Sequence, residues 1–330
     1  MKYNSFETLF NHFNTINALI IGDVMIDAYI WGKVERISPE APVPVVRVTK
    51  RDYRLGGAAN VALNVQALGA NPIICSIIGN DEEASRLEKQ LHTVGISAEG
   101  LIRSDERPTT VKTRVISANH HIVRIDEEST SDITVKEKAF LLKKIELLLP
   151  KCDVVIFEDY DKGCIDAEVI QKTVALAKTH NIPTVVDPKK RNFLDYKNTT
   201  LFKPNLKELK EGLKLEFDAT NSKELIAAVQ QLKQTISCDV ALITLSEHGV
   251  MISDNHSNHH IPAHVREIAD VSGAGDTVIS IAALAMALQL PSKLVAELSN
   301  LGGGLVCEHV GVVTINKQQL LKEAEKGISL

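Results

Sequence analysis

The chain has 330 residues, 44% of them hydrophobic, and a formal net charge of −5. This size suffices for one large domain or two ordinary ones, each with a substantial core. The acidic balance excludes a general attraction to nucleic acid or to an anionic membrane, so an anionic ligand would need local basic residues.

The cysteines and the N-terminal segment indicate a cytosolic protein. The five cysteines are widely spaced and include no CxxC pair, which argues against a disulfide framework or a zinc knuckle. The polar start MKYNSFETLFNHFNTIN is not a signal peptide, and no apolar run is long enough to cross a membrane. We therefore expect a soluble, cytoplasmic protein with reduced thiols and no nucleic-acid or membrane partner.

Short β-branched runs alternate with helical patterns along the chain. The runs predict strands at Ala18–Gly22, Ile73–Ile78, Val154–Glu158, Thr184–Asp187 and Val240–Thr244. The helical patterns cover Ala58–Gly69, Glu82–Gly95, Val135–Leu149, Ala167–His180 and Asn221–Thr235. This alternation predicts an α/β fold with a mostly parallel sheet that is covered by helices on both faces.

Two segments interrupt the alternation. Trp31–Arg54 contains three prolines and an alternating VPVVRV run, and Thr109–Asp126 predicts two short strands around a turn at Ala118–His121. Antiparallel pieces of this kind do not fit a parallel core. We predict one core domain over residues 1–330, with a small β-sheet lid formed by about 29–54 and 109–126.

The stretch DVSGAGD (Asp270–Asp276) precedes an apolar run at Ser280–Leu290, which predicts a buried helix that begins near Gly275. The first turn of a helix has free N–H groups and the positive end of the dipole, and glycines let an anion approach them. Asp276 would then lie beside the anion, where it could accept a proton from a hydroxyl group. Alternatively, the glycines form a turn and Asp276 caps the helix. This stretch alone leaves both interpretations open.

A second stretch, LGGAANVAL (Leu55–Leu63), also has paired glycines before a helix, with Asn60 in its first turns. Neither stretch is a Walker A loop or a dinucleotide fingerprint, because the required spacings are absent. Two such helix starts, together with an aspartate after the first strand, favour a functional site.

Three motifs resemble those of one enzyme family. GGAANVA (Gly56–Ala62) and DVSGAGD resemble the two signatures of the ribokinase-like, or PfkB, sugar kinases, and PNLKE (Pro204–Glu208) resembles their N-x-x-E motif. The resemblance covers nearly the whole chain. It implies a ribokinase-like three-layer core with a β lid, and a sugar kinase that uses ATP and Mg²⁺.

Four further stretches resemble one branch of this family, which phosphorylates the C1 hydroxyl of D-glycero-β-D-manno-heptose 7-phosphate in lipopolysaccharide core biosynthesis. They are Gly22–Val46, Arg54–Ala70, Glu158–Gly163 and Asp187–Lys190. In many bacteria such a kinase is fused to an adenylyltransferase with an HxGH loop. This chain has no such loop, so we expect a stand-alone kinase. A kinase of the family for another sugar, sugar phosphate or nucleoside, or a catalytically silent sugar-binding homologue, remains an alternative.

The resemblance implies the catalytic roles. Asp276 would deprotonate the acceptor hydroxyl, and the amides of Gly273, Ala274 and Gly275 would stabilise charge on the transferred phosphoryl group. Ser272 stands where the family usually has threonine, and it retains the hydroxyl group. Asp270 and Ser272 could also hold a monovalent cation such as K⁺.

The resemblance also implies a nucleotide site. Asn205, Leu206, Lys207 and Glu208 would lie near the ATP phosphates, with Glu208 organising a hydrated Mg²⁺. Without the resemblance, Glu208 would be read as a solvated helix residue. Thr244 and Gly249 would border the nucleotide. Asn300 would lie beside adenine, although LSNLGGGLVC replaces a segment that is richer in alanine in relatives.

On the sugar side, Asp27, Gly56, Gly57 and Asn60 would line the pocket, because carboxylates and amides suit polyol recognition. The alternative for Asp27 is a turn or a helix cap. Basic residues gather in the two lid segments: Arg36, Arg47, Lys50, Arg51, Arg54, Lys112 and Arg114. From these segments we select Lys112 and Arg114, together with Lys189, as candidates to hold a distal phosphate. The alternative is that they face solvent.

Two remaining features complete the expectations. Four histidines lie in Asp254–His264, which we interpret as an exposed hairpin rather than a metal site. The lid sheet would present edge strands, so we expect a homodimer through the lids.

Overall fold

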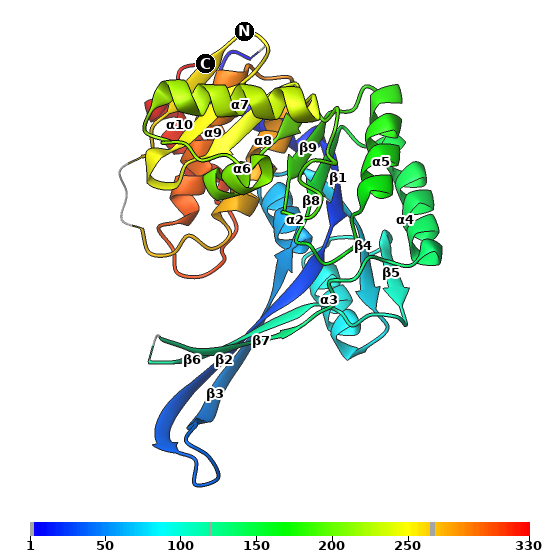
Figure 1. Cartoon of the computed structure of the whole chain (residues 1–330), viewed down its shortest axis with the longest axis vertical. Coiled ribbons are helices and arrows are strands. Elements are labelled where there is room, and N and C mark those ends of the chain that lie inside the picture. Colours follow the sequence, from blue (N-terminus) through cyan, green and yellow to red (C-terminus); the bar gives the residue numbers. More distant parts are fainter. Residues whose placement is uncertain (1–2, 119, 265–267) are drawn as a thin grey trace.

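The computed structural model describes residues 3–118, 120–264 and 268–330. Nine strands form the main sheet in the order β13-β12-β11-β10-β9-β8-β1-β4-β5 (Figure 1). Neighbouring strands are parallel from β5 to β11, whereas β12 and β13 are antiparallel additions at one edge. The bounds are β1 Asn17–Gly22, β4 Asn71–Gly79, β5 Leu101–Ser104, β8 Val154–Glu158, β9 Thr184–Asp187, β10 Leu201–Phe202, β11 Val240–Thr244, β12 Val250–Ser253 and β13 Asn258–Ile261.

Helices cover both faces of this sheet. One face packs against α1 (Phe6–His12), α2 (Ala58–Ala67), α3 (Glu82–Thr93), α8 (Ala274–Ala287), α9 (Ser292–Val306) and α10 (Lys317–Gly327). The other packs against α4 (Val135–Leu148), α5 (Ala167–Thr179), α6 (Leu206–Leu213) and α7 (Ser222–Ile236). Single 3₁₀ turns occupy Phe13–Thr15, Leu149–Lys151 and Ser246–His248.

Side chains that alternate along each central strand join the three layers. Ile20 and Ile156 point into the core on one face, whereas Ile21 and Phe157 point into the core on the other. Both faces of a parallel sheet are therefore buried, which explains why the strands read as continuous apolar runs. The predicted three-layer α/β architecture is confirmed.

The predicted core elements agree with the structure to within a few residues. β8, β9 and β11 have the predicted bounds, and α8 begins at Ala274, next to the predicted Gly275. Helix α7 starts one residue later than predicted, because Asn221 is its N-cap and accepts from the Lys223 N–H. The sequence did not predict β5 and β10, which have only four and two residues.

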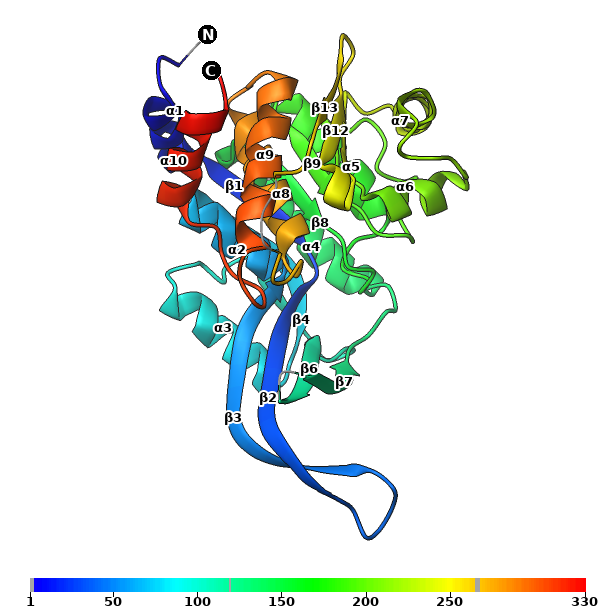
Figure 2. The same ribbon diagram turned by 90° about the vertical axis from the view of Figure 1, so that its left-hand side faces the viewer.

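A second sheet, in the order β3-β2-β6-β7, extends from the core as an arm (Figures 1 and 2). Its strands are β2 Val24–Ile37, β3 Pro44–Gly57, β6 Val111–Ser117 and β7 His120–Glu127. Strands β2 and β6 are parallel, and the other two pairs are antiparallel. In the predicted turn at Ala118–His121, Asn119 lies outside the described residues.

The lid strands begin and end closer to the core than predicted. Strand β2 starts at Val24 rather than near residue 29, because Val24–Ala28 are buried and pair with the last residues of β3. Asp27 therefore lies within a strand, and its reading as a turn or helix-cap residue was wrong. Strand β3 ends at Gly57, and α2 follows without a loop.

The two ends of the chain lie close together, where α1 and α10 pack side by side (Figure 2). The predicted hairpin around the histidines is confirmed, since β12 and β13 flank Asp254–Ser257. Among the described residues, no helix combines the length and the apolar character needed to cross a bilayer.

The junction between β3 and α2 requires glycine. Gly57 has φ 57° and ψ −133°, and a Cβ there would lie 2.4 Å from the carbonyl oxygen of Asp23. We expect Gly57→Ala to lower the free energy of unfolding by at least about 2 kcal/mol, because strain and a backbone clash combine. Denaturant unfolding measures this loss. Gly327→Ala is the control, since a Cβ there meets nothing within 4 Å; a loss of similar size in both variants would contradict the prediction.

Candidate active site

The carboxylate of Asp276 lies in the first turn of α8, at the carboxyl edge of the main sheet. It is nearly buried, with a residue exposure of 7%. The Asn60 side chain donates a hydrogen bond to Oδ2 at 2.6 Å, and the Tyr160 hydroxyl donates one to Oδ1 at 3.0 Å. These two donors fix the position of the carboxylate, as expected for a positioned general base.

Burial raises the pKa of Asp276 to about 6, and the nearby Asp187 carboxylate acts in the same direction. The hydrogen bonds from Asn60 and Tyr160 act in the opposite direction, because they stabilise the charged form. A carboxylate with this pKa is ionised at neutral pH and still accepts a proton more readily than an exposed aspartate.

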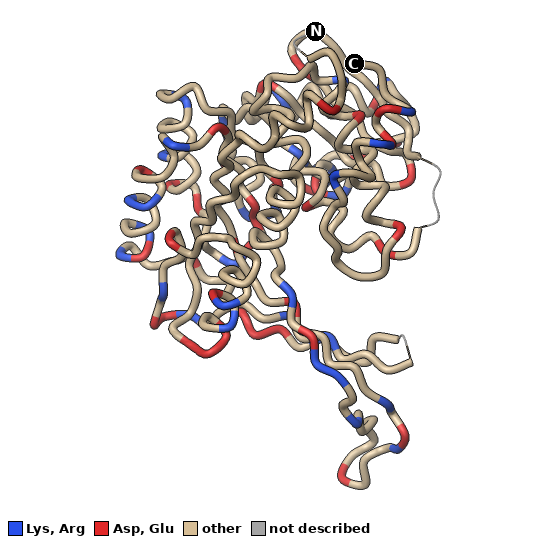
Figure 3. The backbone as a smooth tube through the Cα atoms, turned by 180° about the vertical axis from the view of Figure 1, so that it is seen from behind, with Lys and Arg blue, Asp and Glu red and all other residues tan. Residues whose placement is uncertain are grey.

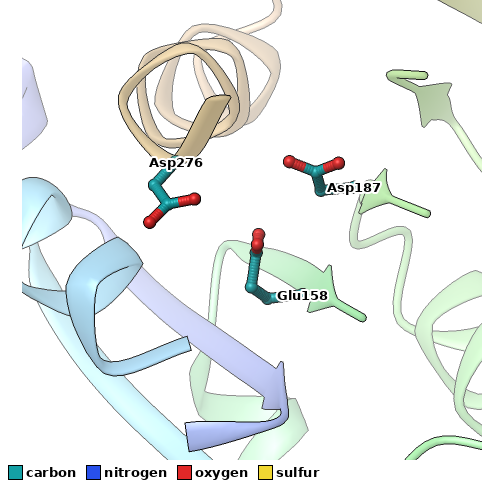
Figure 4. A group of neighbouring side chains, drawn as sticks. All are labelled: Glu158, Asp187 and Asp276. Carbon is teal, nitrogen blue, oxygen red and sulfur yellow. The ribbon is translucent and has the colours of Figure 1, made fainter. Parts of the chain in front are cut away.

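Two further carboxylates lie beside Asp276. Glu158 ends β8 and Asp187 ends β9, and oxygen atoms of the three side chains lie within 4.8 Å of one another. Figure 4 shows the three carboxylates directed toward one another from two strand ends and a helix. Parallel neighbouring strands bring these residues together, because their carboxyl ends share one edge of the sheet.

Two lysines partly balance this negative charge. The buried Lys203 ammonium lies 2.8 Å from Asp187 Oδ2, and Lys189 lies 3.7 Å from Asp187 Oδ1 and 3.2 Å from Glu208 Oε1. A Cβ on Gly275 would lie 3.7 Å from Asp187 Oδ2 and 3.8 Å from Lys203 Nζ. The missing side chain at Gly275 therefore leaves open space between the start of α8 and this ion pair, where an anion could approach both.

The predicted N-x-x-E motif forms the start of α6. Asn205 is the N-cap and accepts from the Glu208 N–H, and Glu208 Oε2 accepts from the Asn205 N–H in return. Leu206 and Lys207 form the turn between them. This capping box orients the Glu208 carboxylate next to Lys189, so Glu208 is not merely a solvated helix residue.

A cavity of about 340 Å³ adjoins the start of α8. Its lining contains the predicted nucleotide residues Thr244, Gly249 and Asn300, together with Ala274 and Gly275. The Asn300 side chain donates to the Pro262 carbonyl at 2.8 Å. The structure thus brings together residues that are far apart in the sequence, in a cavity that reaches the predicted anion site.

The residues of the DVSGAGD stretch before Gly275 shape the loop that leads into α8. Asp270 Oδ1 accepts from the backbone and hydroxyl of Ser272, and Oδ2 accepts from the Gly311 N–H. Gly273 has φ 80° and is the N-cap of α8. The Ala274 N–H donates to the Val271 carbonyl at 3.3 Å, so this predicted anion-hole amide is engaged within the loop.

The predicted sugar residues lie where the lid meets the core. Asp27 is buried in β2, and a Cβ on Gly56 would lie 2.3 Å from Asp27 Oδ2, so a side chain at position 56 would displace this carboxylate. Gly57 leads into α2, which carries Asn60. Asn60 links this group directly to Asp276.

The lid cations differ in their surroundings. Arg114 pairs with Asp27 at 2.5 Å, whereas Lys112 lies 2.7 Å from Glu128 and 3.4 Å from Asp126. Figure 3 shows basic and acidic residues interspersed along the lid. Lys189 contacts Asp187, Glu208 and the Tyr160 ring, so it lies beside the acidic groups of the core rather than with Lys112 and Arg114.

The chain matches the profile of the pfkB family carbohydrate kinases over residues 15–319. The protein is a PfkB-family carbohydrate kinase. It is 38% identical to the bifunctional protein HldE of Citrifermentans bemidjiense over 330 residues, which cover 99% of this kinase and 67% of that protein. The kinase thus spans about two thirds of the length of such relatives.

Solved structures of the family share the fold. A variant of phosphofructokinase-2 from Escherichia coli superposes with a TM-score of 0.77 at 15% identity, covering 93% of this kinase and 98% of that chain. Ribokinase from Arabidopsis thaliana, complexed with ribose and ATP, gives a TM-score of 0.72 at 13% identity, covering 93% and 99%. The predicted ribokinase-like fold is confirmed.

Several residues of this kinase's site were not assigned roles from the sequence. They are Glu158, Tyr160, Asp187 and Lys203, and each follows or ends a buried strand. A polar residue at the carboxyl end of a parallel strand is a usable signal for a site. It requires knowing that β8 and β9 are neighbours, which the sequence alone does not establish.

The hydrogen bond from Tyr160 to Asp276 has a measurable consequence. Activity should fall as the pH drops through about 6, because Asp276 acts as a base only when ionised. Tyr160→Phe removes a donor that favours the charged form, so this acid limb should move upward by roughly one pH unit. Profiles of kcat/KM against pH measure the shift.

Tyr196→Phe is the matched control, because the Tyr196 hydroxyl donates to Asp159 at 2.8 Å and not to Asp276. An unchanged acid limb in Tyr160→Phe, or an equal shift in both variants, would contradict the assigned role of Tyr160.

Proposed function

We propose that this kinase transfers the γ-phosphoryl group of ATP to the C1 hydroxyl of D-glycero-β-D-manno-heptose 7-phosphate. The product is the 1,7-bisphosphate, an intermediate on the route to ADP-heptose and the lipopolysaccharide core. The observation that carries the chemistry is the Asp276 carboxylate, held by Asn60 and Tyr160 at the start of α8. The choice of sugar rests on the four stretches that resemble the heptose 7-phosphate kinases.

On the acceptor side, Asp276 takes the proton of the C1 hydroxyl as the oxygen attacks the phosphoryl group. Asn60 and Tyr160 occupy one lone pair on each carboxylate oxygen, so they orient the group and leave lone pairs for the substrate. Asp27 bonds sugar hydroxyls from the lid side. Because these groups are buried, the hydroxyls of a bound polyol would take the place of water as their hydrogen-bond partners.

On the donor side, ATP occupies the cavity of about 340 Å³ beside Thr244, Gly249 and Asn300, with its phosphates toward Gly275. Lys203 and Lys189 supply positive charge near the transferred group, and the first turn of α8 supplies amides and the helix dipole. Mg²⁺ fits this donor set, because Glu208 and Asp187 are carboxylates at that position. When bound, Mg²⁺ would neutralise charge on the phosphate oxygens.

The distal phosphate of the sugar requires cations on the lid. Arg114 and Arg54 lie 5.4 Å and 4.9 Å from the centre of the Tyr29 ring, so two guanidinium groups flank one aromatic side chain. Lys112 has two carboxylate neighbours, Glu128 and Asp126, whereas Arg114 and Arg54 each have one, Asp27 and Asp52. We therefore favour Arg114, with Arg54, as the phosphate-binding residues. A K⁺ ion at Asp270 and Ser272 remains a prediction.

The proposal includes a homodimer through the lids. Large apolar side chains are exposed along the lid: Val34, Ile37, Val43, Val48, Ile122, Val123 and Ile125. A second lid would remove this surface from water, which favours association.

The role of Asp276 as the base is tested by Asp276→Asn. This change should lower kcat by about 10²–10⁴-fold, because the amide cannot accept the hydroxyl proton. Binding of ATP, followed by calorimetry, should stay within a few-fold of the wild type. Near-normal turnover of the variant would remove Asp276 as the base.

The substrate is tested with a panel of sugars and sugar phosphates. The 7-phosphate of the heptose should be used with a kcat/KM roughly 10–100-fold higher than the free heptose, because charged hydrogen bonds hold its phosphate. Arg114→Met should reduce this preference. Arg47→Ala should keep it, since Arg47 is 65% exposed and pairs with Glu35 farther along the lid.

Equal use of the two heptoses would contradict the assignment of the lid cations. Preferential use of another sugar in the panel would contradict the proposed substrate while leaving the kinase chemistry intact.

A further inference from the structure

Glu128 is a carboxylate that bridges the lid and the core. It follows the last lid strand, β7, in the segment that leads to α4. Its Oε2 atom lies 2.7 Å from the ammonium group of Lys112 on β6, and its Oε1 atom lies 2.8 Å from the ammonium group of Lys162. One carboxylate thus binds two cations, one on the lid and one in the turn at residues 159–163 that follows β8.

The bridge is largely shielded from solvent. The exposed fractions of the side chains are 13% for Lys112, 19% for Glu128 and 15% for Lys162. Burial acts to raise the pKa of Glu128, but the bonds to the two lysines lower it further, so the pKa lies below its ordinary value. Glu128 is therefore ionised at neutral pH, and both of its charge-assisted bonds are protected from competing water.

The turn that carries Lys162 also carries Tyr160, the donor to the catalytic carboxylate. The buried Asp23 carboxylate accepts from the backbone N–H groups of Tyr160 and Lys162, at 2.9 Å and 3.0 Å. One residue separates the two, so the turn presents both side chains from a single short piece of backbone. A displacement of Lys162 would therefore change the position of the Tyr160 hydroxyl relative to Asp276.

The turn also packs directly against the segment that follows Glu128. The Arg107 guanidinium donates to the carbonyl groups of Ser129, Ser131 and Lys162, which joins the two segments. A Cβ on Gly163 would lie 1.9 Å from the Ser131 carbonyl oxygen, so no side chain separates them. These contacts hold the backbones together, and the side chain of Glu128 adds the connection to the lid.

We propose that Glu128 is a positioning residue for the proton acceptor. Through Lys162 it holds the turn where the Tyr160 hydroxyl reaches Asp276, and through Lys112 it joins this turn to the lid. The inference rests on the proposed role of Asp276 as the base.

Both hydrogen-bond donors to Asp276 would then be connected to the lid, by different means. Asn60 is connected through the chain, since α2 follows β3 directly, whereas Tyr160 is connected through the ion pairs of Glu128. The Tyr160 ring also has Lys189 at 5.1 Å from its centre. Loss of the bridge would leave Asn60 and Lys189 in place, so turnover should be impaired and not abolished.

The test measures steady-state kinetics of Glu128→Gln at a pH above the acid limb, with ATP and the acceptor that the substrate panel identifies. The variant keeps the size of the side chain and removes the charge that binds the two ammonium groups. We expect kcat to fall about 3–10-fold, because Tyr160 orients Asp276 less well. The KM for ATP should stay within about twofold of the wild type, because the nucleotide cavity is unchanged.

A double-mutant cycle tests whether the effect passes through Tyr160. Tyr160→Phe removes the hydroxyl whose position Glu128 would control. Adding Glu128→Gln to Tyr160→Phe should therefore lower kcat by less than about twofold. A general loss of structure would instead lower kcat by the same factor in both backgrounds.

Glu127→Gln is the matched control, because Glu127 is the adjacent carboxylate, at the exposed end of β7. Its kcat should stay within about twofold of the wild type. Circular dichroism checks that each variant is folded. If Glu128→Gln does not fold, Glu128→Asp keeps the charge but is too short to reach both ammonium groups, and it should also lower kcat.

Wild-type kcat in Glu128→Gln would overturn the proposal, and so would an equal fall of kcat with and without the Tyr160 hydroxyl. Asp276→Asn separates these failures from a failure of the proposed base. Near-normal turnover of Asp276→Asn would remove the base and this inference with it. An inactive Asp276→Asn together with an additive cycle would remove the role of Glu128 alone.

Discussion

The hydrogen bond from Asn60 to Asp276 connects the two glycine-preceded helices on which the site is built. It spans 216 residues of sequence and 2.6 Å of space. Helix α2 brings the end of the lid with it, and α8 brings the cavity beside Gly275. The base, the sugar side and the nucleotide side thus meet at one carboxylate, and the close packing of α2 and α8 is the constraint that holds them there.

Buried charge distinguishes this site from the surrounding core. The carboxyl ends of β8 and β9 place Glu158 and Asp187 where apolar residues fill the rest of the strands. Burial raises the pKa of Glu158 well above its usual value, and the nearby Asp187 and Asp276 raise it further. Such an arrangement is costly for folding and is retained where function requires charge. The buried Lys203 offsets part of this cost through Asp187.

Local patterns predicted most of the core, because β1, β4, β8, β9 and β11 are short apolar runs rich in β-branched residues, whereas β5 and β10 are too short to show a pattern. The role of Asp276 was predictable because glycine, aspartate and an apolar helix are adjacent in sequence. Glu158 and Asp187 were not assigned roles, because their proximity depends on the strand order β9-β8-β1. Lys112 looked like a free cation in the sequence, but its carboxylate partners come from β7 and the segment after it. The pairing of neighbouring strands determines which charged side chains become partners, and the composition of the sequence does not reveal that pairing.

The uninterrupted passage from β3 into α2 sets how the lid is joined to the core. Only Ala58 and Ala59 separate Gly57, the last lid residue, from Asn60. The lid is therefore joined to the core at this point without a flexible linker. A tilt of the lid strands would therefore displace Asn60, the hydrogen-bond partner of the catalytic carboxylate, because only two residues lie between Asn60 and the lid. Whatever occupies the lid, whether a sugar phosphate or a second lid, has a short mechanical path to the proton acceptor.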